Sequence, residues 1–145
     1  MRRIFADANV LIAGADSRSG ASNALLRLAE VGLFRLVVSR QVLDEAERNV
    51  RKKLPRALPN FAALLAQLPM EIVPDPVDEE CLRWAEVIEL KDTPILAAAV
   101  LANVDRLVTL NTKDFTPAVT QASGLFIQTP SQLIQDIRRI VEENL

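Results

Sequence analysis

The chain has 145 residues, of which half are apolar and a quarter charged, and its formal net charge is −2. This composition predicts one domain over residues 1–145 with a sizeable core, and it excludes a disordered or strongly basic chain. The absence of histidine excludes Ser-His-Asp and Cys-His hydrolases, and the single cysteine excludes an internal disulfide.

The first half of the chain alternates predicted strands and helices. Short runs rich in β-branched residues favour strands, and amphipathic segments with a helical period favour helices. Ser39 is expected to cap the second helix. In chain order, we predict a buried strand running into a turn over Arg3–Ile12, a helix over Ser19–Val31, a strand over Phe34–Ser39, and helices over Gln41–Leu54 and Asn60–Leu68.

The second half continues this alternation. Asp78 is expected to cap a helix that runs to Leu90, and Thr93-Pro94 to open a helix over Ile95–Asn103. The latter is apolar almost all round, so it should be buried. The remaining predictions are strands over Glu71–Pro74, Arg106–Leu110 and Gly124–Gln128, and an amphipathic helix from Thr129-Pro130-Ser131 to Glu143.

The alternation of strands and helices predicts the α/β fold class, with a mainly parallel sheet of about five strands and helices on both faces. Such sheets bind ligands beyond the carboxyl ends of their strands, so the search for chemistry begins there. No apolar run is long enough to cross a bilayer, and we therefore expect a cytoplasmic protein without membrane association.

Four acidic residues fall at the junctions between these elements. Asp7 lies in an apolar run, where burying an uncompensated charge is costly, and each of the other acids adjoins a strand or the buried helix. Each acid also has an ordinary explanation: a turn for Asp7 and Asp114, a first helical turn for Glu45, and a cap for Asp92. Together, four converging carboxylates would repel one another unless a cation held them. Oxygen ligands without His or Cys select Mg²⁺ or Mn²⁺.

The segments around these acids resemble the four motifs of PIN domains, in the order that the family shows them. The matching segments are Asp7-Ala8-Asn9-Val10-Leu11, Val42-Leu43-Asp44-Glu45, Asp92-Thr93-Pro94-Ile95-Leu96-Ala97-Ala98-Ala99 and Thr109-Leu110-Asn111-Thr112-Lys113-Asp114-Phe115. Thr129-Pro130-Ser131 also resembles the branch of toxins from toxin–antitoxin pairs. The resemblance covers essentially the whole chain. It implies a three-layer PIN-like fold and an endoribonuclease that depends on Mg²⁺ or Mn²⁺.

The resemblance also assigns roles to single residues. Asp7, Glu45, Asp92 and Asp114 match the acids that hold the metal and serve catalysis. Asn9, Thr109 and Asn111 match polar positions that support these acids. Because the family places its last acid at different points of the fourth motif, Asn111 stays an alternative to Asp114 for completing the site.

The resemblance further implies an RNA substrate, a cognate antitoxin and a homodimer. Arg48 and Lys52 lie on roughly the Glu45 face of the predicted helix and could steer phosphates, although a solvated charged face explains them better. Two alternatives stay open. One is a catalytically inactive PIN-like module that binds RNA or serves as a scaffold. The other is a receiver or phosphoryl-transfer domain, which Asn9 and the lack of a well-placed lysine disfavour.

Overall fold

Five short parallel strands form one sheet in the computed structural model, which describes residues 1–145. The strand order is β3-β2-β1-β4-β5, and every neighbouring pair is parallel. The predicted five-stranded, mainly parallel sheet is therefore confirmed. The strands are β1 (Arg3–Ala6), β2 (Arg35–Ser39), β3 (Met70–Val73), β4 (Arg106–Val108) and β5 (Ile127–Gln128).

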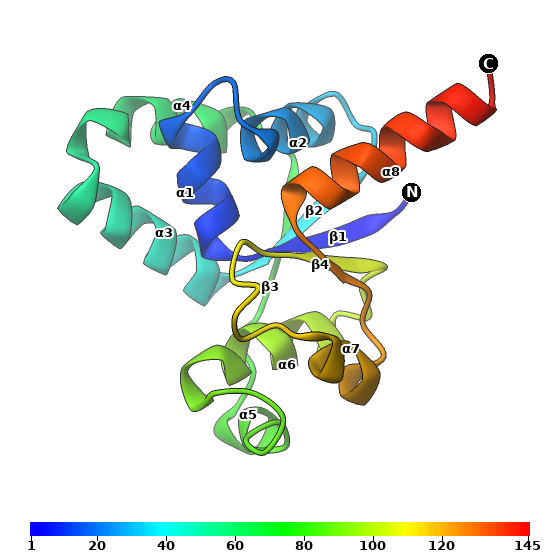
Figure 1. Ribbon diagram of the computed structural model, residues 1–145. Coiled ribbons are helices and arrows are strands. Elements are labelled where there is room, and N and C mark those ends of the chain that lie inside the picture. Colours follow the sequence, from blue (N-terminus) through cyan, green and yellow to red (C-terminus); the bar gives the residue numbers. More distant parts are fainter.

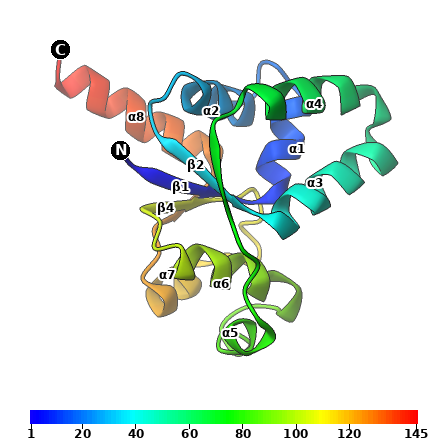
Figure 2. The ribbon, with the colours of Figure 1, turned by 180° about the vertical axis from the view of Figure 1, so that it is seen from behind.

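Helices cover both faces of the sheet and complete the three layers (Figures 1 and 2). One face carries α1 (Ala8–Asp16), α2 (Ala21–Glu30), α3 (Arg40–Lys53), α4 (Leu58–Gln67) and α8 (Pro130–Glu143). The other face carries α5 (Asp78–Leu82), α6 (Thr93–Leu101) and α7 (Pro117–Ser123). Two short 3₁₀ turns, η1 (Pro55–Ala57) and η2 (Leu90–Asp92), precede α4 and α6.

The hydrophobic core is one cluster of 33 buried residues that spans both faces of the sheet. Phe5, Val37 and Leu107 from the central strands are fully buried in it. Six of the nine residues of α6 are buried, as its continuous apolar sequence predicted. None of the helices combines the length and the apolar character that crossing a bilayer requires.

Side-chain caps begin two of the helices, and the cap at Ser39 was expected. The Ser39 hydroxyl accepts a hydrogen bond from the Val42 amide at 3.2 Å, so α3 begins where its sequence predicted. Thr129 and Gln132 form a reciprocal capping box at the start of α8. These contacts satisfy amide groups that a helix start otherwise leaves unpaired.

The predicted strand over Arg3–Ile12 is wrong beyond Ala6. The chain turns at Asp7 and continues as α1, whose first amide, at Ala8, donates to the Asp7 carboxylate at 2.7 Å. Val10 and Leu11 are fully buried because α1 packs against α2, α3 and α4. A short helix that is buried in this way has the same continuous apolar sequence as a buried strand.

The region after β3 also differs from the prediction. The helix that begins at Asp78 ends at Leu82 instead of Leu90, and its N-cap residue is Val77. Consecutive turns then carry the chain to η2. Helix α7 was not predicted; it runs from Pro117 to Ser123 and is capped by Gly124, whose φ of 75° suits glycine. Strand β5 is shorter than the predicted range Gly124–Gln128.

Candidate metal centre

The strand order reverses at β1, which lies between β2 and β4. Ligands of open parallel sheets bind beyond the carboxyl ends of the strands at such a point. Asp7 directly follows β1, and Asp114 lies in the loop after β4. Glu45 lies on α3, which follows β2, and Asp92 ends η2 at the start of α6. The topology therefore brings all four predicted acids to one edge of the sheet.

A pocket of about 340 Å³ opens at this edge. Three of the predicted acids, Asp7, Glu45 and Asp92, line it together with Asn9 and Asn111. Asp114 lies beside the pocket, and its carboxylate accepts a hydrogen bond from the Asn111 amide group at 3.1 Å. The pocket is thus lined by carboxylates and amides, with Lys91 as the only basic residue in its wall.

Asp7 is the most buried of these acids, with 7% of its surface exposed. One carboxylate oxygen accepts from the Ala8 amide, and the other accepts from the Thr109 hydroxyl at 2.8 Å and from Asn9 Nδ2 at 3.3 Å. Burial raises the pKa of Asp7, and the hydrogen bonds from Thr109, Ala8 and Asn9 partly oppose this shift. Asp7 therefore both caps α1 and presents a constrained carboxylate to the pocket.

Asn9, Thr109 and Asn111 link the acids through hydrogen bonds. The Asn9 side chain donates to Thr109 at 3.3 Å and accepts from the Leu110 amide at 3.0 Å, which joins the start of α1 to the loop after β4. Thr109 Oγ1 accepts from the Asn111 amide at 3.0 Å. Asn111 Nδ2 then faces both Asp92 at 3.4 Å and Asp114 at 3.1 Å. The structure thus brings these three residues into contact with the carboxylates.

The ordinary explanations for Glu45 and Asp92 do not hold in the structure. Glu45 is in the second turn of α3, and the first turn of this helix contains no acidic residue. Asp92 occupies the N-cap position of α6, but its side chain makes no capping hydrogen bond. Helix capping and the helix dipole therefore leave both carboxylates unexplained.

Electrostatic repulsion and burial act on these carboxylates. Burial, and then the charge of Asp7, raise the pKa of Glu45, which Arg48 partly lowers. Burial and the adjacent Asp114 raise the pKa of Asp92 to about 6. The hydrogen bond from Asn111 is the main reason that the pKa of Asp114 is lowered. The site thus holds more negative charge than its hydrogen bonds compensate.

A divalent cation fits this set of donors. Asp92 Oδ2 is buried and has no hydrogen-bond partner, which is costly for a carboxylate oxygen unless a cation binds it. Apart from Lys91, the polar side chains that line the pocket are carboxylates and amides, whose oxygens suit hard cations such as Mg²⁺ and Mn²⁺.

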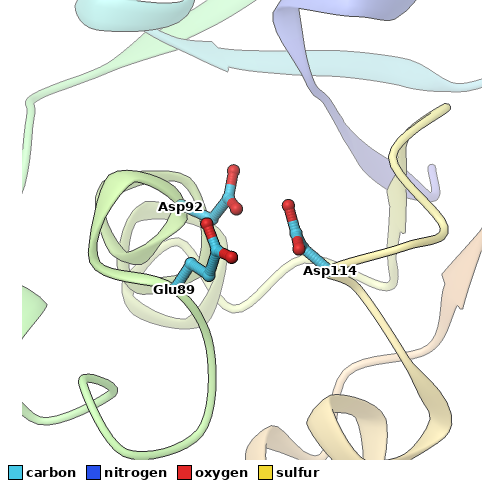
Figure 3. Close-up of side chains that lie close together, drawn as sticks. All are labelled: Glu89, Asp92 and Asp114. Atoms are coloured by element: carbon cyan, nitrogen blue, oxygen red, sulfur yellow. The ribbon is translucent and has the colours of Figure 1, made fainter.

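Glu89 is an acid of this site that the sequence analysis missed. Its carboxylate faces those of Asp92 and Asp114 (Figure 3), and one oxygen of each residue lies within 4.8 Å of the other two. Glu89 precedes Asp92 by three residues, and the Asp92 amide donates to the Glu89 carbonyl at 2.9 Å. The i, i+3 spacing of two acids before a buried helix was the available signal. It was overlooked because Glu89 lies outside the four motifs.

The basic residues proposed for substrate binding lie outside the pocket. Arg48 and Lys52 are exposed on α3 and make no ion pair. Asn49, on the same helix, lines the pocket instead, and its amide donates to the Glu45 carbonyl at 2.9 Å. Arg48 is still near enough to Glu45 to lower its pKa.

The sheet order and the acidic pocket define a parallel α/β protein with a candidate metal site beyond the carboxyl ends of its strands. A model of PIN domains matches residues 3–113, and the chain therefore belongs to the PIN domain family. No curated protein matches the chain.

Solved structures show the same fold at low sequence identity. PAE2754 from Pyrobaculum aerophilum is 17% identical, with 92% of this chain and 88% of that chain covered and a TM-score of 0.63. A toxin–antitoxin complex from Klebsiella pneumoniae is 23% identical over 88% of this chain and 97% of that chain, with a TM-score of 0.62. The toxin VapC20 from Mycobacterium tuberculosis, which cleaves the sarcin–ricin loop, is 18% identical over 82% of this chain and 94% of that chain, with a TM-score of 0.54.

Proposed function

We propose that this PIN domain is an endoribonuclease that depends on Mg²⁺ or Mn²⁺ and acts in the cytoplasm as the toxin of a toxin–antitoxin pair. The observation that carries the proposal is the buried, unpartnered Asp92 Oδ2 in a pocket that Asp7 and Glu45 also line. The likeness to a toxin–antitoxin complex and to a toxin that cleaves the sarcin–ricin loop supports RNA as the substrate.

Asp7, Glu45, Asp92 and Asp114 would hold the metal in this proposal. A divalent ion held there would lower the pKa of a water, so that hydroxide is available near neutral pH, and would polarise the phosphate under attack. No histidine base is needed, which fits a chain without histidine. The expected products of phosphodiester hydrolysis are a 5′-phosphate and a 3′-hydroxyl.

The hydrogen-bonding residues keep the carboxylates in place for this chemistry. Thr109 and Asn9 fix one Asp7 oxygen, so the carboxylate cannot rotate freely. Asn111 donates to Asp92 and Asp114 and so partly compensates two neighbouring negative charges. Such supporting contacts commonly change metal affinity or activity by about 10- to 100-fold when they are removed.

The partners follow from the same proposal. An antitoxin protein would bind the chain, as in the Klebsiella pneumoniae complex. Arg48 and Lys52 would attract RNA phosphates toward the pocket from the exposed side of α3. A homodimer remains a prediction, which size-exclusion chromatography with light scattering would test.

The decisive experiment is cleavage of a mixed RNA pool in Mg²⁺, in Mn²⁺ and in EDTA. Wild type is compared with Asp92→Asn and with Asp16→Asn, a control at an exposed position on α1 outside the pocket. We expect cleavage that requires metal, is lost in Asp92→Asn and is retained in Asp16→Asn. If folded wild type bound the pool without cleaving it, the chain would instead be an inactive RNA-binding module.

A further inference from the structure

Three carboxylates gather on the outer side of the pocket, next to Lys91. Figure 3 shows Glu89, Asp92 and Asp114 directed toward a common space, and one oxygen of each lies within 4.8 Å of the others. Two oxygens on opposite sides of one Mg²⁺ ion are about 4.2 Å apart. The three oxygens are therefore close to the separation of ligands around one ion, and Glu89 is exposed, so its side chain has room to adjust.

Two independent observations point to a cation at this position. Asp92 has a buried side chain, and its Oδ2 atom has no partner within the protein. Lys91 Nζ lies 3.8 Å from a carboxylate oxygen of Glu89 and 3.8 Å from one of Asp114. A positive charge of the protein itself therefore already lies between two of the three acids.

The contacts of Lys91 with Glu89 and Asp114 are long, and the lysine side chain itself is mostly exposed. Both distances exceed the usual length of a charge-assisted hydrogen bond, and 69% of the lysine side chain is exposed. The pair with Glu89 is exposed on both sides and contributes little to stability, whereas the side chain of Asp114 is only 10% exposed. Lys91 is thus free to leave when a divalent cation, with twice its charge, binds the same carboxylates.

We propose that Glu89 is a further metal ligand, which joins Asp92 and Asp114 on the outer side of the pocket, and that Lys91 competes with the metal there. The inference rests on the proposed metal-dependent function. It adds Glu89 and Lys91 to the four acids that the sequence predicted. It predicts opposite effects for neighbouring residues of one turn: the loss of Glu89 weakens metal binding, and the loss of Lys91 strengthens it.

The test is calorimetric titration of Mn²⁺ into the metal-free protein, without RNA. We expect Glu89→Gln to lower the affinity for at least one Mn²⁺ ion about tenfold, as for other losses of a metal-supporting group. Glu89→Asp keeps the charge but withdraws the carboxylate, so it should lower the affinity as well. Lys91→Met should raise the affinity severalfold. Glu86→Gln, which changes an exposed glutamate outside the cluster, should leave it unchanged.

The possible results separate the proposals. Wild-type affinity in Glu89→Asp would overturn the role of Glu89 as a ligand, because the charge alone would then suffice. If Lys91→Met bound Mn²⁺ with the affinity of wild type, the proposed competition between Lys91 and the metal would be overturned. If wild type itself bound no Mn²⁺, the proposed metal-dependent function would fail, whatever the variants did. Thermal unfolding in EDTA verifies that every variant is folded.

Discussion

The Thr109 hydroxyl is buried between the carboxylate of Asp7 and two neighbouring groups. It donates to Asp7 at 2.8 Å and accepts from the Asn111 amide at 3.0 Å. Because only 1% of Thr109 is exposed, water cannot replace these contacts. Thr109 is therefore one of three donors, with Ala8 and Asn9, that hold the Asp7 carboxylate in place.

Replacing Thr109 by valine keeps the shape of the side chain and removes this hydroxyl. We expect Thr109→Val to lower Mn²⁺ affinity by about 10- to 100-fold, because Asp7 loses a donor that holds its ionised form. Calorimetric titration measures the change, and Thr109→Ser, which restores the hydroxyl, should recover most of the affinity. Equal affinities in Thr109→Val and wild type would contradict this role.

The raised pKa of Asp92 has a consequence for stability in the absence of metal. A carboxyl whose folded-state pKa is about 6 is stabilised in its protonated form. The resulting contribution of Asp92 to the free energy of unfolding is fully present below the ordinary pKa of aspartate, near 4. It is lost as the pH rises through about 6. Ionised Asp92 therefore destabilises the metal-free protein at neutral pH.

We predict that Asp92→Asn stabilises the metal-free protein at pH 7.5 by about 1–2 kcal/mol, a value reduced for solvent screening. At pH 4 the two proteins should differ little, because Asp92 is then largely protonated. Urea unfolding in EDTA at both pH values measures the difference. A variant that was less stable than wild type at pH 7.5 would show that the charge of Asp92 is compensated within the protein.

At the scale of elements, α1 holds one side of the site and packs closely on α2. A Cβ atom at Gly14 would lie 2.4 Å from Leu26 Cδ1, and Leu26 is fully buried. The two helices approach this closely only because position 14 has no side chain. The same packing holds α1 in place, and Asp7 is the N-cap residue of this helix.

Gly14→Ala should therefore destabilise the fold by about 1–3 kcal/mol, since Leu26 cannot move without disturbing the core. Chemical unfolding measures the loss. Gly20→Ala is the matched control, because its Cβ would meet only Ser17 at 3.6 Å. A loss of stability in Gly14→Ala no larger than that in Gly20→Ala would show that α1 and α2 separate easily.

The order and type of most elements could be predicted from local sequence. The capped starts of α3 and α8 and the apolar helix α6 carry signals within a few residues. Helix α1 could not be recognised, because its burial by three other helices removes the polar face that marks a helix. Helix α5 was extended too far because nothing local marks the turns after Leu82.

The candidate site was predicted less evenly. Asp7, Glu45, Asp92 and Asp114 stand out because each adjoins a strand or the buried helix, and their convergence follows from parallel topology. For Glu89 the i, i+3 spacing to Asp92 is the only local signal, and Lys91 carries none, because both side chains meet Asp114 only after the loop beyond β4 folds onto η2. Contacts of this kind depend on tertiary structure and leave no local pattern.

At the scale of the whole molecule, we propose that the 33-residue core unfolds as one domain over residues 1–145. Metal binding should then stabilise the whole molecule, because the unfolded chain does not assemble the site. At a free Mn²⁺ concentration of 100 times Kd, the expected gain is about 2.7 kcal/mol. For a chain of this length, that gain corresponds to a rise in Tm of roughly 8 °C.

Differential scanning calorimetry with Mn²⁺ or EDTA tests this prediction. We expect a single transition that Mn²⁺ shifts upward in wild type and hardly at all in Asp7→Asn. Ca²⁺ at the same concentration shows how far the site selects between hard cations. Two transitions, of which only one responded to Mn²⁺, would contradict a single cooperative domain.

The central place of β1 in the sheet also determines when the site can exist during synthesis. β1 pairs with β2, which follows soon in the chain, but Asp7 meets Thr109 only when β4 docks on the other side of β1. A nascent chain that has emerged only as far as β3 thus lacks Asp92, Thr109, Asn111 and Asp114. Asp7 and Glu45 precede β3 in the sequence, whereas Asp92 and Asp114 follow it. An unfinished chain that ends near β3 therefore carries no assembled site. The proposed ribonuclease activity therefore has no assembled site until most of the chain has been translated and has folded.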